Sequence, residues 1–443
     1  MKPAQICLSL YGFTERICAD IESSPDADLY EVRMDLSESL DCGTVRNATA
    51  KPLIFTAHDA AHTLRDARSF ADYLDAGTNR AAGRKAIVSV HAEESDPDAL
   101  WARLSGDHVN KIVMNTRNYA IIARLLDLNR KQDRQSLCFA QGDVGSFSRV
   151  LSVFYGAPWI YACLPDRSTG AGQFTLQQLS EIFRIKRFNR MPHIFGIVGN
   201  PVYHSKSPEF HNHRFAEYSL PWIYLPFLCE NLSALLQYAP SFGIIGFSIT
   251  HPFKKEIVSH LQEASPEVKE LQCCNTVFFK EGRWHGTNTD IIGVRAIVER
   301  HQVPIANSRV VVLGAGASAR AVVSVVRAHA KEITILNRTP STAAELAAEF
   351  DCKSGRLEDF GSCQYDVVFQ TTPIGMRAGE SPVDLNALKP ATTVMDILYE
   401  PATTALLEKA AAIGCRAYNG TVWFEAQAQA QFDWWQSKIK NKR

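Results

Sequence analysis

Three features that would narrow the class of protein are missing from this chain: an excess of one charge, a long apolar run and a cysteine motif. Lys plus Arg number 47, as do Asp plus Glu, so no overall field favours nucleic acid or a membrane surface. No apolar run approaches the roughly 18 residues that a membrane span needs. The eleven cysteines contain no CxxC pair, which favours buried thiols in a reducing cytoplasm over disulfides or a zinc site. We therefore expect a cytoplasmic protein with small-molecule partners and no metal, nucleic acid or membrane.

Internal repeats, low-complexity linkers and a signal or transit pattern are missing as well. At 443 residues the chain is too long for one ordinary domain. We expect a first domain at 1–190, a second at 191–290 that the C-terminal helices 402–443 complete, and a third at 291–401. The sequence leaves the oligomeric state open.

The first part of the chain alternates short apolar runs with amphipathic stretches. This rhythm predicts a (β/α)₈ barrel, whose active site lies where the strands end. A helix is expected over Thr175–Asn189, before a boundary at Met191-Pro192. The expected strands are Gln5–Leu10, Leu29–Asp35, Pro52–His58, Asp72–Ala76 (the weakest pattern), Ala86–His91, Val109–Asn115, Ser136–Gln141 and Trp159–Leu164.

A second βα series begins at His193, and a third begins at Arg309. The third has the pattern of a doubly wound dinucleotide-binding fold, so the whole chain is expected to be α/β. The expected elements of the second series and of the C-terminus are strands Ile194–Val198, Trp222–Phe227 and Gly243–Thr250, helices Pro208–Tyr218 and Leu232–Tyr238, a hairpin of Thr276–Lys280 with Trp284–Thr287, and a final helix from Val422 to about Ser437.

A glycine-rich loop follows the buried strand Arg309–Leu313. It consists of Gly314, Ala315, Gly316, Ala317 and Ser318, and the next helix is expected over Ala321–Ala330. Glycines at this place allow the helix N-terminus to face a pyrophosphate. The alternative is a plain glycine turn, but the position between strand and helix favours nucleotide binding.

The next strand, Glu332–Leu336, ends in Asn337-Arg338-Thr339. An NAD enzyme usually carries an acidic residue here for the ribose 2′-hydroxyl, whereas Arg338 is suited to a 2′-phosphate. The alternative is a solvated surface charge. The placement favours NADP as the cofactor.

Two serines precede the helix at Pro208. Ser205 and Ser207, beside the unpaired N–H groups of a helix that Ser207 is expected to cap, could hold a carboxylate. Taken alone, the segment is also compatible with an ordinary helix start that has Pro208 at its first position.

The segment Gly199-Asn200-Pro201-Val202-Tyr203-His204-Ser205-Lys206-Ser207-Pro208 resembles the signature of the shikimate dehydrogenase family. Further motifs of that family follow in its order over the last 250 residues or so. They are Ser248 to Lys254, Asn275-Thr276-Val277, Gly286 to Asp290, the glycine loop, Asn337-Arg338-Thr339, Thr371 to Met376, Asp396 to Pro401, Gly420 and Gln427-Ala428.

This resemblance implies specific roles. Lys254 and Asp290 would form the acid–base pair at the ketone, where a positive group stabilises the charge that develops on the oxygen; without the family motifs, a structural ion pair would be the simpler interpretation. Ser205 and Ser207 would bind the carboxylate, and Thr250, Asn275, Tyr399 and Gln427 the hydroxyls. The implied NADP contacts are Gly314, Ala315, Gly316, Ala317, Ser318, Asn337, Arg338, Thr339, Thr371, Met376 and Gly420.

In the first part, Lys111 stands inside an apolar strand, where a charge is costly unless it is paired or neutral. A desolvated lysine can attack a ketone and form a Schiff base; the alternative is a barrel-lining lysine with a carboxylate partner. His91 ends another strand, at the side of a barrel where active sites lie. A lone histidine there is more often structural than catalytic.

These segments together resemble type I 3-dehydroquinate dehydratase. The matching pieces are Glu31-Val32-Arg33, Ser89-Val90-His91, Lys111-Ile112, Phe147-Ser148-Arg149 and Gly172-Gln173. The resemblance implies that Lys111 forms the imine, His91 moves the protons and Arg149 holds the carboxylate. Glu31 and Arg33 would contact hydroxyls, and Gln173 with Ser168 (Thr169 being the alternative) would lie on a loop that closes over the substrate.

The chain departs from the dehydratase pattern after Phe55-Thr56-Ala57. His58 and His62 stand where that family usually has an arginine and a glutamate that orients the catalytic histidine. The two resemblances predict consecutive reactions, 3-dehydroquinate to 3-dehydroshikimate and then to shikimate with NADPH. The alternatives are a shikimate dehydrogenase with a non-catalytic barrel and a quinate dehydrogenase; Ser207 argues against the latter.

Overall fold

The computed structural model describes residues 3–58, 64, 66–77, 86–104, 106, 108–131 and 134–440. These form two compact units, Met1–Phe247 and Ser248–Arg443. The units do not test the expected three-part division, which stays a prediction. Within the described ranges, no helix is both long and apolar enough to cross a membrane.

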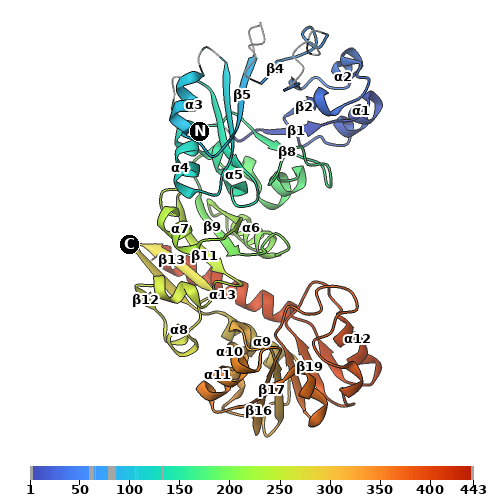
Figure 1. Ribbon diagram of the computed structural model, residues 1–443, viewed down its shortest axis with the longest axis vertical. Coiled ribbons are helices and arrows are strands. Elements are labelled where there is room, and N and C mark those ends of the chain that lie inside the picture. The colour runs from blue at the N-terminus through green and yellow to red at the C-terminus, as the bar shows by residue number, and fades with distance from the viewer. Residues whose placement is uncertain are drawn as a thin grey trace. The chain divides into compact units, whose positions relative to one another are not determined.

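Eight parallel strands form the first sheet, in the order β7-β6-β5-β4-β3-β2-β1-β8 (Figure 1). Their side chains are buried almost throughout, as in a parallel sheet covered on both faces. The strands are β1 (Ile6–Leu10), β2 (Leu29–Arg33), β3 (Leu53–Thr56), β4 (Tyr73–Asp75), β5 (Ala86–Glu93), β6 (Val109–Asn115), β7 (Ser136–Gln141) and β8 (Ile160–Ala162). The predicted eight-stranded parallel α/β fold is confirmed, including its weakest strand, and among the described residues the sheet is open between β7 and β8.

Among the described residues, five α-helices accompany this sheet: α1 (Thr14–Glu22), α2 (Cys42–Asn47), α3 (Pro97–Arg103), α4 (Tyr119–Leu128) and α5 (Ser146–Phe154). In the described part of the β3–β4 connection the chain forms turns and no helix. The prediction of one helix over Thr175–Asn189 is wrong. The segment holds a π-helical turn, η2 (Gln178–Ile182), and a 3₁₀ turn, η3 (Ile185–Arg187), because Arg184 between them has a left-handed φ of 50°.

The first unit continues with β9 (His193–Gly199), α6 (Ser207–Glu217), β10 (Trp222–Leu228), α7 (Leu232–Tyr238) and the start of β11 (Ile244–Ile249). Strands β9 and β10 are parallel, with Ile194 opposite Ile223. All five elements match the predicted ones to within about two residues. Their burial on both faces again fits a parallel α/β layer.

The second unit contains the predicted antiparallel hairpin of β13 (Thr276–Lys280) and β14 (Arg283–Thr287), to which β12 (Glu263–Ala264) adds in parallel. The long C-terminal helix α13 (Thr421–Lys440) packs against α9 (Asp290–Arg300) and donates from the Trp435 indole to the Val277 carbonyl at 3.1 Å. These contacts hold α13 beside the residues at the start of α9.

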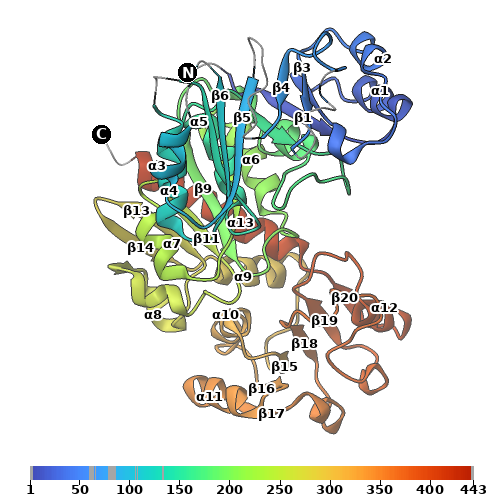
Figure 2. The same cartoon turned by 45° about the horizontal axis from the view of Figure 1, so that its top comes forward.

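A six-stranded parallel sheet completes the second unit, in the order β17-β16-β15-β18-β19-β20 (Figure 2). Its strand order reverses between β15 and β18, the place where doubly wound folds bind nucleotides. The strands are β15 (Arg309–Leu313), β16 (Glu332–Asn337), β17 (Lys353–Arg356), β18 (Val367–Gln370), β19 (Thr393–Asp396) and β20 (Arg416–Tyr418). Helices α10 (Ala317–Val326) and α11 (Pro340–Phe350) follow β15 and β16, and α12 (Ala405–Ala412) follows β19.

Alternate side chains of β15 explain why this sheet is buried on both sides. Val310 and Val312 join the cluster that includes side chains of α9, α10 and α11, while Val311 and Leu313 join the cluster that includes α12. Helix α10 begins four residues earlier than the predicted Ala321 and ends earlier than Ala330. The helix therefore begins at once after Gly316, which makes the glycine turn as short as a pyrophosphate site requires.

Candidate functional sites

The ends of the barrel strands surround a cavity of about 170 Å³. Strands β7 and β8, at opposite ends of the sheet order, both line it, so the sheet curls around it. The lining residues are Ser9, Glu31, Arg33, His58, His91, Lys111, Val113, Phe139, Gln141, Arg149, Tyr161, Thr169, Gly170 and Gln173. The barrel residues predicted from the sequence thus gather on one cavity, except Ser168. His62 lies outside the described residues.

Lys111 is buried in β6, and its ammonium nitrogen lies 3.2 Å from Oδ2 of Asp75 at the end of β4. The same nitrogen lies 4.7 Å from the centre of the Tyr161 ring. Asp75 is fully buried and also accepts hydrogen bonds from Ser89 Oγ at 2.6 Å and Gly77 N at 3.1 Å. Lys111 therefore has a carboxylate partner, as expected if it were only a barrel-lining lysine. Its position on the cavity, however, also suits a nucleophile.

Two histidines stand beside this ion pair. The His58 and His91 rings lie 4.8 Å apart, and Nδ1 of His58 is 3.9 Å from Oδ1 of Asp75. Desolvation, followed by the positive charge of Lys111, lowers the pKa of His91 from 6.5 to about 3. His91 is exposed to solvent, and solvent screening reduces this shift. It is a neutral base at physiological pH.

Burial alone would raise the pKa of Asp75, but Lys111, His58 and Ser89 together lower it. Asp75 is therefore an anion that holds Lys111 in place. The sequence analysis missed Asp75, although the weak strand pattern at 72–76 contains it. The residue is 36 positions from Lys111, and only the adjacency of β4, β5 and β6 brings the two together.

Arg149, in α5, is buried on the cavity wall without a carboxylate partner among the described residues. Its Nη2 donates to the Ala171 carbonyl at 2.9 Å and its guanidinium lies 4.6 Å from the centre of the Phe139 ring, but Nε has no hydrogen-bond partner. Desolvation lowers its pKa to about 10, so it is still a cation at neutral pH. A buried guanidinium that faces a cavity without a carboxylate partner is suited to bind a carboxylate.

Glu31 and Arg33 project from β2 toward the same cavity. Glu31 is buried and accepts from Ser9 Oγ at 2.6 Å and from Thr56 Oγ1 at 2.8 Å. Arg33 makes a two-bond ion pair with Asp35, at 2.9 and 2.7 Å. Both residues are thus fixed in orientation, as polar groups that recognise hydroxyls need to be.

Three residues of the loop 166–173, Thr169, Gly170 and Gln173, line the cavity, and Gln173 organises the loop. Gln173 Oε1 accepts from Thr169 N at 2.9 Å, from Thr169 Oγ1 at 3.1 Å and from Ser168 Oγ at 3.4 Å. Thr169 lines the cavity, whereas Ser168 is exposed and donates to the Gly170 carbonyl at 2.7 Å. In this conformation Thr169 is better placed than Ser168 to contact a substrate.

In the second unit, Lys254 and Asp290 form a close ion pair, with 2.6 Å between Nζ and Oδ2. Asp290 is the first residue of α9, where the helix dipole favours an anion. Its other oxygen, Oδ1, accepts from Asn275 Nδ2 at 3.1 Å. Its own N–H donates to Asn288 Oδ1 at 3.0 Å. Two motifs that are 36 residues apart therefore form one fixed ion pair.

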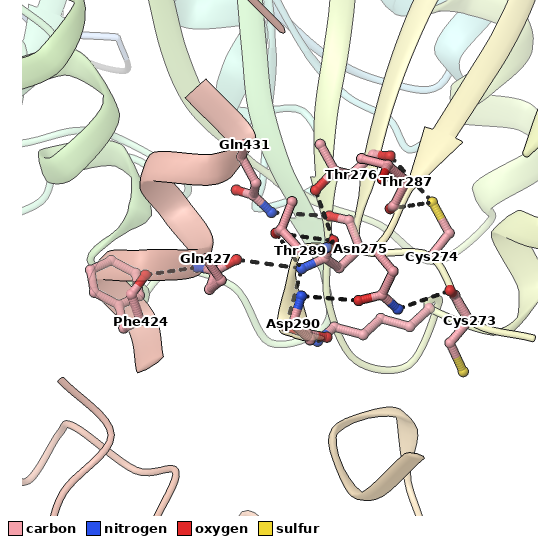
Figure 3. Close-up of polar contacts among 12 residues, drawn as sticks. Cys273, Cys274, Asn275, Thr276, Thr287, Thr289, Asp290, Phe424, Gln427 and Gln431 are labelled. Carbon is pink, nitrogen blue, oxygen red and sulfur yellow. Dashed lines mark hydrogen bonds and ion pairs between the residues drawn. The ribbon is translucent and has the colours of Figure 1, made fainter. Parts of the chain in front are cut away.

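Asn275 is the centre of a polar cluster around this pair (Figure 3). Its side-chain nitrogen contacts Thr289 Oγ1 at 3.0 Å and Gln427 Oε1 at 3.4 Å, and its Oδ1 accepts from Thr289 N at 2.8 Å. Gln431, one turn further along α13 than Gln427, donates to the Asn275 carbonyl at 3.2 Å and accepts from Ser248 Oγ at 2.7 Å. Sequence reasoning found Gln427 but missed Gln431, which orients the cluster from within the core.

The remaining predicted substrate contacts lie on loops. Ser205 Oγ accepts from the N–H of Ser207 at 3.2 Å and donates to Ser207 Oγ at 3.1 Å. The prediction that Ser207 caps the helix is wrong, because Ser207 is the first helical residue and no side chain caps α6. Thr250 follows β11, and the Tyr399 ring packs 4.7 Å from that of Phe424 at the start of α13.

The glycine loop fits a nucleotide. Gly314 has a φ of 105°, and a Cβ there would lie 2.7 Å from Thr371 Oγ1, so only glycine is tolerated. At Gly316 a Cβ would meet nothing within 4 Å, which leaves open space in front of the first N–H groups of α10. Ala315 is buried, and Ala317 and Ser318 form the first turn of the helix. This is the cradle that a pyrophosphate requires.

At the end of β16, Asn337 Nδ2 donates to the Thr339 carbonyl at 3.0 Å, and Arg338 is exposed. Among the described residues, no carboxylate pairs with Arg338, which therefore remains available to a phosphate.

The other residues predicted to contact the cofactor, Thr371, Met376 and Gly420, have different surroundings. Thr371 Oγ1 donates to the Leu313 carbonyl at 2.6 Å, so this hydroxyl ties β18 to β15. Met376 is 40% exposed. A Cβ at Gly420 would lie 1.9 Å from the Ile397 carbonyl oxygen, so Gly420 is needed for packing whatever else it does.

The fold and the two sites define an enzyme that joins a lyase-type barrel to an NADP-dependent dehydrogenase. Three family models match the chain. They are type I 3-dehydroquinase over residues 66–189, the shikimate dehydrogenase substrate binding domain over 197–277 and shikimate / quinate 5-dehydrogenase over 296–375.

The chain is 36% identical to a shikimate dehydrogenase (NADP(+)) of Bacillus thuringiensis, over 57% of the chain and 95% of that protein. It is also 29% identical to a chloroplastic bifunctional 3-dehydroquinate dehydratase/shikimate dehydrogenase of Arabidopsis thaliana, over 92% of the chain and 77% of that protein. The chain belongs to the shikimate dehydrogenase family, and it is a bifunctional member with a type I 3-dehydroquinate dehydratase in front.

Solved structures agree with this assignment. A shikimate dehydrogenase from Aquifex aeolicus superposes with a TM-score of 0.53 at 29% identity, covering 56% of this chain and 94% of its own. Another, solved in complex with NADP⁺, gives 0.52 at 31% identity, covering 56% and 90%. A quinate dehydrogenase from Corynebacterium glutamicum in complex with NAD gives 0.50 at 26% identity, covering 54% and 92%. The cofactor of this chain is NADP.

Proposed function

We propose that the barrel dehydrates 3-dehydroquinate through an imine on Lys111. The observation that carries this proposal is the buried Arg149 guanidinium, which has no carboxylate partner in the part of the chain that the structure describes and shares its cavity with Lys111 and His91. Arg149 binds the substrate carboxylate and so brings the ketone to Lys111. Glu31 and Arg33 contact the hydroxyls, and Gln173 with Thr169 or Ser168 closes the site.

The protonation states of the side chains in this cavity support the mechanism. The Lys111 ammonium first gives a proton to the neutral His91. The free amine then attacks the ketone carbon, and the same proton leaves in the water that is released as the imine forms. His91, whose lowered pKa keeps it neutral, removes a proton from the adjacent carbon and then returns it to the departing hydroxyl. Water finally hydrolyses the imine and releases 3-dehydroshikimate.

We infer that the second reaction reduces this ketone at Lys254 and Asp290. NADPH supplies the hydride when it is bound at the glycine loop. Lys254 stabilises the negative charge that develops on the ketone oxygen and delivers a proton to it, while Asp290 holds Lys254 in place. Ser205 and Ser207 bind the carboxylate, and Thr250, Asn275, Tyr399 and Gln427 contact the hydroxyls.

Replacing Arg338 with alanine should lower the preference for NADPH over NADH. The change removes a charge-assisted contact to the 2′-phosphate worth about 1.5–3 kcal/mol, so the ratio of kcat/KM values should fall by about one to two powers of ten. Arg309→Ala is the matched control. Arg309 is also exposed, but it is the first residue of β15, at the end of the strand away from the glycine loop. Equal use of both cofactors by the unmodified protein would contradict this role.

One assay tests the proposed function as a whole. The protein is incubated with 3-dehydroquinate, with and without NADPH, and the products are identified. We expect 3-dehydroshikimate without NADPH and shikimate with it. Unchanged 3-dehydroquinate would indicate a non-catalytic barrel, and quinate as the main product with NADPH would indicate a quinate dehydrogenase. All eleven cysteines are free thiols, which supports a reducing compartment such as the cytoplasm.

A further inference from the structure

The Tyr203 hydroxyl joins two loops that the proposed function places at different active sites. Tyr203 lies between β9 and α6, in a turn closed by the hydrogen bond from Ser205 N to the Val202 carbonyl at 3.2 Å. Its hydroxyl donates to the Asp143 carbonyl at 2.6 Å and lies 2.6 Å from Ser146 Oγ. Tyr203 is 40% exposed as a whole residue, but desolvation of its hydroxyl raises the pKa to about 12, so the hydroxyl stays a neutral donor.

Residues 142–146, between β7 and α5, directly support the loop over the barrel cavity. Gly142 N donates to the Ala171 carbonyl at 3.1 Å, and Arg149 Nη2 donates to the same oxygen at 2.9 Å. Gly172 has a φ of +70°, and a Cβ there would lie 2.4 Å from the Gly142 carbonyl oxygen and 3.1 Å from Ser146 Cβ. A shift of Ser146 would therefore also displace the loop 166–173.

Other contacts hold the barrel against the segment that carries Tyr203. The Phe147 ring lies 4.8 Å from that of Phe227 and 5.3 Å from that of Phe242. Tyr155 donates its hydroxyl to the Ser241 carbonyl at 2.8 Å. Because this apolar and polar packing exists without Tyr203, the Tyr203 hydroxyl can be removed without separating the two parts.

We propose that Tyr203 is a positioning residue for both reactions. Through Ser146 it fixes the loop 166–173 over the dehydratase cavity, and through its own turn it fixes Ser205 for the carboxylate of the dehydrogenase substrate. The inference rests on the proposed function, because it takes the roles of this loop and of Ser205 from there. The hydroxyl joins the two loops, so losing it weakens substrate binding at both sites, although Lys111 and Lys254 are untouched.

The test separates substrate binding from chemistry in each reaction. In Tyr203→Phe, KM for 3-dehydroquinate and KM for shikimate should both rise about three- to tenfold, the loss typical of one hydrogen bond. Both kcat values and KM for NADP⁺ should stay within about twofold. Tyr238→Phe, which alters a half-buried tyrosine at the end of α7, is the matched control and should change neither KM.

The decisive variant is Ser146→Ala, which changes only a barrel residue. It should raise KM for shikimate as well as KM for 3-dehydroquinate, and the double variant should be no worse than Tyr203→Phe alone, because both changes break the same contact. A rise in only one of the two KM values, or in neither, overturns the inference while both activities remain. Absence of either activity from the unmodified protein would instead refute the proposed function.

Discussion

Lys111→Ala is expected to abolish dehydration of 3-dehydroquinate while leaving NADPH-dependent reduction of 3-dehydroshikimate largely unchanged. Lys111 is the one lysine among the described residues that line the barrel cavity, so no other amine there can form the imine. Loss of a covalent nucleophile should lower kcat by at least about three powers of ten. Dehydration is followed by the ultraviolet absorbance of the conjugated product, and reduction by oxidation of NADPH.

Borohydride trapping checks the covalent step itself. Added together with 3-dehydroquinate, it should reduce the imine and leave a stable adduct on Lys111, located by peptide mass spectrometry. His91→Ala should still give the adduct but not turn over, because it removes the proton carrier and keeps the amine. Lys254→Ala is the matched lysine control and should be trapped like the unmodified protein. An adduct on another lysine, or none, would contradict the assignment.

The barrel could be predicted from the sequence because its strands are buried on both faces and read as apolar runs. The chemistry of its cavity could be predicted only in part. Lys111 was expected to be desolvated, but the structure adds the fully buried Asp75 at 3.2 Å, and this contact depends on β4 lying next to β5. A three-residue strand carries too little pattern to show which side of the sheet its aspartate faces.

Helix ends show a second limit of the sequence. The pattern placed Ser207 as a cap, whereas Ser205 bonds to the N–H of Ser207 and α6 starts one residue earlier than a cap would allow.

Gln431 was also missed from the sequence. Its neighbours on α13 suggest an exposed polar face, yet it is buried and bonded to Ser248 and Asn275. Local periodicity cannot reveal a buried polar contact between segments 150 residues or more apart.

Replacing Lys254 with alanine or Asp290 with asparagine is expected to lower kcat for shikimate oxidation by about two to four powers of ten. Lys254→Ala removes the group that carries the proton and stabilises the charge on the oxygen. Asp290→Asn keeps the shape of the side chain but leaves Lys254 without its partner at 2.6 Å. The contact between Asp290 Oδ1 and Asn275 is also altered, so the lysine loses both its charge partner and its orientation.

Cofactor binding distinguishes this loss of chemistry from a loss of structure. The glycine loop at 314–318 and Arg338 are unchanged in both variants, so the dissociation constant for NADPH, measured by its fluorescence, should stay near that of the unmodified protein. Lys255→Ala is the matched control, because Lys255 is the exposed neighbour of Lys254 and should keep full activity. Near-normal turnover in Lys254→Ala or Asp290→Asn would show that the pair is only a structural ion pair. Loss of NADPH binding in either variant would show that the change disturbs the fold of the second unit, because neither side chain belongs to the proposed cofactor site.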